Sequence, residues 1–136
     1  MKKDEIFDRN KIKEKSFRRF INSFINSFNG LKYAYIHEQS FILHALSVII
    51  VLVSGFYFHI SKMQWAILLI VLAMVMITEL INTAIEATVD LITNKYNELA
   101  KIAKDCGSAA TFVSSILAVG LYAYVFLPQI IRLFFK

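Results

Sequence analysis

Long uncharged stretches alternate with short polar segments along this chain. The uncharged stretches cover residues 41–61, 63–78 and 106–131. A membrane-spanning helix needs about 20 predominantly apolar residues. The first and third stretches reach this length alone, and the second reaches it only by including the polar residues that follow it. The pattern predicts an all-α integral membrane fold with transmembrane helices over residues 40–61, 64–92 and 107–130.

The N-terminal part of the chain has a different periodicity. From Phe17 to Leu31, apolar residues recur every three or four positions, and polar residues lie between them. This spacing places the apolar side chains on one face of a helix. The other face is too polar to span a membrane, so we expect an amphipathic helix over residues 16–36 that lies in the membrane interface. A charged leader, residues 1–15, precedes it.

Composition narrows the class of protein. The chain has 136 residues, of which 57% are hydrophobic, so it is too apolar for an ordinary soluble domain and too short for several domains. We expect one membrane domain over residues 16–136. Three short antiparallel helices bury little polar surface alone, which favours an oligomer. The single cysteine, Cys106, excludes an intrachain disulfide and a cysteine metal site.

The distribution of positive charge predicts the orientation in the membrane. Lysine and arginine are frequent before residue 33 and in the polar loop expected over residues 93–105, and they are sparse near the other helix ends. By the positive-inside rule, the N-terminus and this loop face the cytoplasm. The first thirty residues do not resemble a cleavable signal peptide, and the net charge of +5 follows no pattern of a nucleic-acid reader.

A row of polar residues follows the second uncharged stretch. Glu79, Asn82, Glu86 and Asp90 are spaced at i, i+3, i+7 and i+11, so on a helix they lie within an arc of about 80° and along about 16 Å. We call these four residues the polar strip. An unpaired charge at the centre of a bilayer costs about 2.5–3.5 kcal/mol or more. A cationic ligand is therefore expected beside the strip.

The acids and a lysine near this row predict phosphoryl transfer. Glu38 and Glu86 offer the carboxylate oxygens that Mg²⁺ prefers when it bridges substrate phosphates. Glu79 lies about two turns deeper and suits a general base toward a lipid headgroup. Lys104, beside Asp105, supplies a cation for phosphate oxygens, and positioning with charge neutralisation is most of what phosphoryl transfer needs. The four glycines are far apart, which excludes a P-loop.

Other interpretations stay open at this point. Membrane carboxylates also bind cations or protons in small transporters, but transport sites usually lie near the midplane between inverted repeats, and no repeat is visible here. A purely structural role in a membrane oligomer does not explain why the polar strip is present in a membrane helix. Asp90 is also consistent with a solvated helix end, and Glu38 with a plain helix cap. The three histidines, His37, His44 and His59, do not cluster and are interpreted as interfacial or packing residues.

Two motifs carry a family resemblance. Residues 79–90 read ELINTAIEATVD, and residues 103–110 read AKDCGSAA. Together they resemble the signature of the prokaryotic diacylglycerol kinase and undecaprenol kinase family. The resemblance implies three transmembrane helices with an N-terminal surface helix and a homotrimer with shared active sites in a bacterial plasma membrane. It also implies ATP- and Mg²⁺-dependent phosphorylation of a membrane lipid alcohol.

The resemblance assigns roles to individual residues. Glu79 is the base that takes the hydroxyl proton, and Glu38 and Glu86 bind the metal. Asn82 and Asp90 support the site. The nucleotide contacts that it implies are Arg19, Asn26, Glu38, Glu86, Tyr96, Asn97, Lys104 and Asp105.

The substrate is less strongly indicated. Thr83, residues 90–93, His44 and the ending at residues 126–128 look more like the undecaprenol kinases of Gram-positive bacteria. Residues 107–110, which read GSAA, look more like the diacylglycerol kinases of Gram-negative bacteria. Undecaprenol is the favoured acceptor, and diacylglycerol is the alternative.

Overall fold

The computed structural model describes residues 17–135, so the predicted leader over residues 1–15 lies outside the described residues. Between Phe17 and Phe135 all regular elements are α-helices, which confirms the predicted fold class. The chain divides into two compact units, one that ends at Tyr33 and one that begins at Ala34. The helices are α2 (Phe17–His37), α3 (Gln39–Tyr57), α4 (Lys62–Ile92) and α5 (Glu98–Phe134).

Helix α2 contains the predicted amphipathic segment. The rings of Phe20 and Phe24, one turn apart, meet edge to face with their centroids 4.8 Å apart. Ser23 and Ser27 donate hydrogen bonds to backbone carbonyls one turn earlier, at 3.0 and 2.9 Å. The large apolar side chains of the helix are exposed. A position in the membrane interface agrees with this exposure and stays a prediction.

Helices α3, α4 and α5 are each long and apolar enough to cross a membrane, which confirms the three predicted spans. The turn between α3 and α4 is short, as expected. His59 adopts a positive φ of 49° there. Ser61 begins α4 with a capping box, because its hydroxyl accepts a hydrogen bond from the Gln64 amide at 3.2 Å and the Gln64 side chain accepts one from the Ser61 amide at 2.8 Å.

Helix α5 begins earlier and ends later than the sequence predicts. The side chain of Asn97 accepts hydrogen bonds from the amides of Leu99 and Ala100, at 2.9 and 3.1 Å, and starts the helix at Glu98. Only residues 93–97 remain as a connection, and the rest of the expected 93–105 loop is helical. Pro128 lies inside the helix and does not stop it, as membrane helices allow when neighbouring groups compensate for the lost hydrogen bond.

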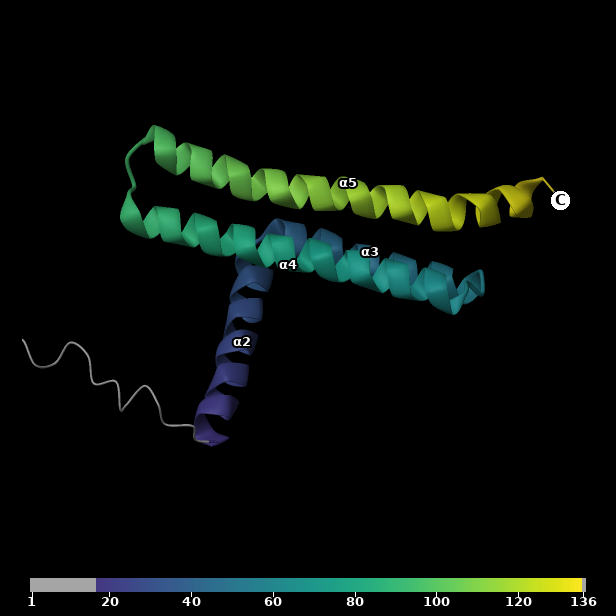
Figure 1. Ribbon diagram of the computed structural model, residues 1–136, viewed down its shortest axis with the longest axis horizontal. Helices are drawn as coiled ribbons and strands as arrows, with labels where there is room; N and C mark the ends of the chain where they lie inside the picture. Colours follow the sequence, from purple (N-terminus) through teal and green to yellow (C-terminus); the bar gives the residue numbers. More distant parts are fainter. Residues whose placement is uncertain (1–16, 136) are drawn as a thin grey trace, which may run out of the picture. The chain divides into compact units, whose positions relative to one another are not determined.

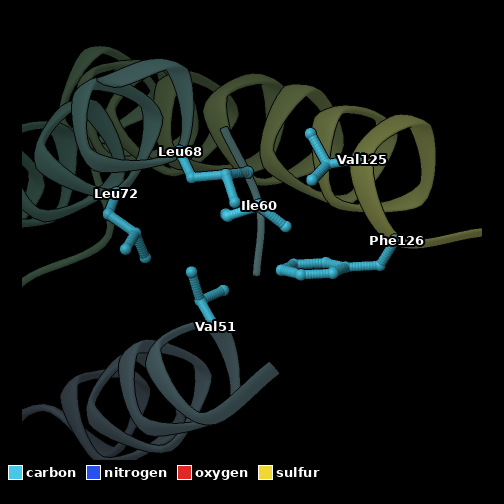
Figure 2. Packing of buried hydrophobic residues seen from close by; sticks show 6 residues of the cluster. All are labelled: Val51, Ile60, Leu68, Leu72, Val125 and Phe126. Carbon is cyan, nitrogen blue, oxygen red and sulfur yellow. The ribbon is translucent and has the colours of Figure 1, made fainter. Parts of the chain in front are cut away.

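Helix α4 packs against both of its neighbours, α5 and α3 (Figure 1). Figure 2 shows apolar side chains from all three helices and the α3–α4 turn pointing toward one another; they are Val51, Ile60, Leu68, Leu72, Val125 and Phe126. Gly55 permits close packing here, since a Cβ at this position would lie 2.5 Å from the Trp65 ring. With 31 and 37 residues, α4 and α5 reach about 46 and 55 Å. Both are longer than the ~30 Å hydrocarbon core, so a part of each helix lies outside the core.

Candidate active site

Glu79 is the most deeply buried carboxylate of the polar strip, with 6% of its surface exposed. Its Oε1 accepts a hydrogen bond from the Ser40 hydroxyl on α3. Its Oε2 lies 3.9 Å from Nε2 of His44, one turn further along α3. A buried charged group needs such partners because water no longer solvates it. The strip therefore faces α3 at this level.

Asn82 links the strip to α5. Its Nδ2 donates a hydrogen bond of 2.9 Å to Oε1 of Glu86. Its Oδ1 is buried and has no hydrogen-bond partner among residues 17–135. This oxygen lies against Gly107, where a Cβ would come within 2.3 Å of it. Only glycine lets α5 approach Asn82 so closely.

Glu38 lies immediately before α3 and completes a set of three acids. Partial burial raises the pKa of Glu38, and the carboxylates of Glu86 and Glu79 raise the pKa further. His37 lowers the pKa to a smaller extent. The Glu38 side chain makes no capping hydrogen bond with the described part of α3. Glu38 is nevertheless the N-cap residue of α3, and its carbonyl accepts a hydrogen bond from the Phe41 amide at 3.2 Å, so it caps the helix through its backbone and not through its carboxylate.

The carboxylates of Glu38 and Glu86 fit a magnesium ion in part. Within residues 17–135 no group of three or more His, Cys, Asp or Glu side chains is arranged to hold a metal. Mg²⁺ is usually held by one or two carboxylates together with substrate phosphates and water. The mutual repulsion that raises the pKa of Glu38 is what a bound cation would relieve. Two carboxylates would therefore be enough protein ligands for a Mg²⁺ ion that is also bound by the phosphates of a nucleotide.

A second group of charged residues lies at the loop end of α4 and α5. Lys104 Nζ is 2.6 Å from Oδ1 of Asp90 and joins the two helices. Asp105 is paired with Lys101 on its own helix. Lys104 and Asp105, although adjacent in sequence, thus belong to two different ion pairs, and Asp90 has a defined partner. Exposed ion pairs contribute little to stability, so a phosphate can replace either carboxylate at little cost.

These residues line a hollow beside the 93–97 connection. Tyr96 is 85% exposed there, and Asn97 uses its side-chain oxygen to cap α5. Asp90 lines the hollow. Four of the predicted nucleotide contacts line it as well, namely Tyr96, Asn97, Lys104 and Asp105. Arg19 and Asn26 lie on α2 in the other unit, and their nucleotide contacts stay predictions.

An apolar cavity of about 220 Å³ lies among α3, α4 and α5. His44, the neighbour of Glu79, lines the cavity together with Val75, one turn before Glu79 on α4. Ser47 and Tyr122 add polar groups to walls that are otherwise mostly apolar. The buried carboxylate therefore stands next to a space suited to an apolar chain.

Comparison with known proteins decides the family. The family model described as prokaryotic diacylglycerol kinase matches residues 25–126. The chain belongs to the prokaryotic diacylglycerol kinase family. Undecaprenol kinase from Bacillus subtilis is 37% identical over 112 residues, which cover 82% of this chain and 91% of that protein. Diacylglycerol kinase from Escherichia coli K12 is 37% identical over 103 residues, which cover 76% and 84%. Diacylglycerol kinase from Helicobacter pylori 26695 is 33% identical over 104 residues.

Family membership confirms the resemblance of the two motifs. The chain is a membrane protein of a lipid kinase family, whose enzymes are phosphotransferases with an alcohol acceptor. The transporter and structural-oligomer interpretations are therefore set aside. Relatives named for undecaprenol and for diacylglycerol match at equal identity, so identity does not distinguish the two acceptors.

Sequence reasoning missed two residues of the site. The sequence assigns no role to Ser40 and favours an interfacial or packing role for His44, yet both side chains contact Glu79. Their spacing of four residues, on the first turns of an otherwise apolar helix, places them on one face. That spacing was the available signal. It does not say which residue of another helix the face meets.

Proposed function

We propose that this chain transfers the γ-phosphoryl group of ATP to the hydroxyl of a membrane lipid in a Mg²⁺-dependent reaction. The observation that carries the proposal is the position of buried Glu79 between an apolar cavity on one side and Glu38 and Glu86 on the other. Glu86 lies seven residues beyond Glu79, which is about 10 Å along the helix. A lipid hydroxyl and a nucleotide can meet between these two levels.

The nucleotide side is assigned to the polar ends of the helices. Glu38 and Glu86 would hold Mg²⁺, which when bound neutralises phosphate charge. Asn82 orients Glu86 through its 2.9 Å hydrogen bond. Lys104 exchanges Asp90 for a phosphate oxygen, and the remaining nucleotide contacts are Asp105, Tyr96, Asn97, Arg19 and Asn26.

The lipid side is assigned to Glu79. As the lipid oxygen attacks the γ-phosphorus, its O–H bond breaks and the proton passes to the Glu79 carboxylate. The new P–O bond forms while the bond from the γ-phosphorus to the ADP oxygen breaks. Burial among α3 and α4 keeps bulk water away from the carboxylate, which limits hydrolysis of ATP.

We further propose undecaprenol as the acceptor. The choice is supported by the match over 91% of the Bacillus subtilis undecaprenol kinase and by the sequence features at Thr83, His44, residues 90–93 and residues 126–128. Diacylglycerol is the second candidate because the Escherichia coli diacylglycerol kinase is equally identical.

The test is to incubate the purified chain in mixed micelles with γ-labelled ATP, Mg²⁺ and either undecaprenol or diacylglycerol. We expect label in undecaprenyl phosphate and little in phosphatidic acid. Preferential labelling of diacylglycerol would reverse the choice of acceptor. Absence of label from both lipids would refute the proposed lipid kinase activity.

The proposed setting is a bacterial plasma membrane with the N-terminus and the nucleotide site in the cytoplasm. The positive-inside bias supports this orientation. A homotrimer with shared sites is proposed because α3, α4 and α5 expose many large apolar side chains, such as Ile50, Ile70 and Phe112. Neighbouring chains and lipid would cover them.

A further inference from the structure

We propose that Ser40 and His44 are positioning residues for the Glu79 carboxylate. The inference rests on the proposed role of Glu79 as the base, and it adds two residues of α3 to the reaction. Ser40 fixes one carboxylate oxygen and His44 faces the other, so the pair determines which oxygen receives the substrate proton.

The two oxygens of Glu79 have different surroundings. Oε1 accepts the hydrogen bond of the Ser40 hydroxyl. Oε2 makes no hydrogen bond with any described residue, and it lies 3.9 Å from His44 Nε2, beyond the 2.7–3.2 Å range of a direct N–H···O bond. Oε2 therefore keeps its lone pairs for the substrate. It points toward His44, and His44 lines the apolar cavity.

The surroundings of His44 hold its ring in place. The buried Phe41 ring meets the imidazole edge to face, with centroids 6.3 Å apart. Ser47 donates a hydrogen bond of 2.7 Å to the His44 carbonyl, which fixes the backbone of the next turn. The imidazole is 17% exposed and the Glu79 side chain 8%. Few rotamers are open to either group in such a packed place.

Fixed orientation matters for a base that acts on a lipid hydroxyl. A carboxylate that rotates about its terminal bond presents its oxygens in turn, whereas one that is tied at Oε1 presents Oε2 in a constant direction. Displacements of about 1 Å at a reacting group can lower a rate by about 100-fold. Ser40 lies one helical turn before His44 and on the same face of α3, and the packing of α3 against α4 brings both side chains to the Glu79 carboxylate.

The experiment measures kcat and the KM for Mg-ATP in the full chain in mixed micelles. We expect Ser40→Ala to lower kcat by ~10-fold or more while the KM for Mg-ATP stays within about twofold. Ser40→Thr, which keeps the hydroxyl, should stay within about threefold of the wild-type kcat. His44→Leu should lower kcat similarly, and His44→Gln, which retains an N–H group, should lower it less. Ser54→Ala is the matched control, since it removes a hydroxyl from the same helix away from Glu79.

Several results would overturn the proposal. One is a Ser40→Ala chain with wild-type kcat, and another is a chain that loses Mg-ATP affinity by the same factor as kcat. Equal losses in Ser40→Ala and Ser40→Thr would mean that side-chain size matters and the hydroxyl does not. The parallel variant Glu79→Gln separates this proposal from the proposed function: if it turns over normally, the base assignment itself fails. If it is inactive while Ser40→Ala is normal, only the positioning role fails.

Discussion

The residues of the polar strip have different partners although the sequence gives them one face. Glu79 accepts a hydrogen bond from Ser40 of α3, and Glu86 accepts one from Asn82. Asp90 forms an ion pair with Lys104. Their exposure increases in the same order, from the buried Glu79 to the exposed Asp90. The strip therefore divides by burial, in agreement with the proposed lipid-side role of Glu79 and the proposed nucleotide-side role of Glu86.

Replacement of Glu79 by glutamine tests the lipid-side role. Glu79→Gln keeps the shape of the side chain and removes the proton acceptor, so kcat should fall by about 10²–10⁴-fold, the usual contribution of a general base. Mg-ATP affinity, measured by equilibrium binding of the nucleotide, should stay near normal. A parallel collapse of affinity would show that Glu79 binds nucleotide.

Replacement of Glu86 by glutamine tests the nucleotide-side role. Glu86→Gln removes one of two carboxylates available to Mg²⁺, so the Mg²⁺ concentration needed for half-maximal activity should rise by ~10-fold or more. Glu98→Gln is the matched control, because Glu98 is an exposed acid in the first turn of α5. An unchanged Mg²⁺ requirement in Glu86→Gln would contradict the metal role.

Between the helices, the close approach of α4 and α5 depends on a glycine of α5 that packs against a polar side chain of α4. Gly107 of α5 lies against Oδ1 of Asn82 on α4. Ser114 of α5 and Thr78 of α4 share a hydrogen bond of 2.8 Å two turns further along. These contacts fix the rotation of α5, and that rotation brings Lys104 to Asp90.

A methyl group at position 107 would disturb this contact. In Gly107→Ala the Cβ would lie 2.3 Å from Asn82 Oδ1, so either the Asn82 side chain must turn away from Glu86 or the two helices must separate, at a cost of about 1–3 kcal/mol. We expect a lower thermal midpoint in detergent and a loss of kcat.

Gly120→Ala is the control on the same helix. No heavy atom of the described residues lies within 4 Å of a Cβ at that position, and alanine favours a helix by about 1 kcal/mol. Equal thermal midpoints in the two variants would argue against a tight contact at Gly107.

For the whole molecule, the proposed trimer determines how much of the exposed apolar surface is covered by protein and how much by lipid. In the second unit α4 packs against both α3 and α5, and large apolar side chains of all three helices stay exposed. Lipid tails cover such side chains as well as protein does, so the proposed trimer would depend on van der Waals packing, hydrogen bonds between helices and lipid entropy.

The oligomeric state in mild detergent tests the proposed homotrimer. Light scattering coupled to size exclusion should give a protein mass of three chains, each of 15.6 kDa, and activity should fall on dilution into excess detergent as chains separate. A fully active monomer would refute the trimer.

Local patterns account for much of the fold. Hydrophobic periodicity depends only on neighbours along the chain. It correctly predicts the four helices found within residues 17–135, three of which are long and apolar enough to cross a membrane. Element ends were predicted less well, because polar residues after Asn97 are equally compatible with a loop and with an exposed helical turn. The Asn97 cap decides between them. Helix α5 likewise continues past Pro128 to Phe134, beyond the predicted end at residue 130.

The sequence by itself determined the class of fold, the polar strip and the family, since each depends on residue identity and spacing along one chain. Only the tertiary structure decided which groups meet: Ser40 and His44 against Glu79, Asp90 with Lys104, and Gly107 against Asn82. The physical reason is that spacing sets the face of a helix, whereas contacts between helices depend on their relative rotation and register. Packing of side chains across the interface sets both.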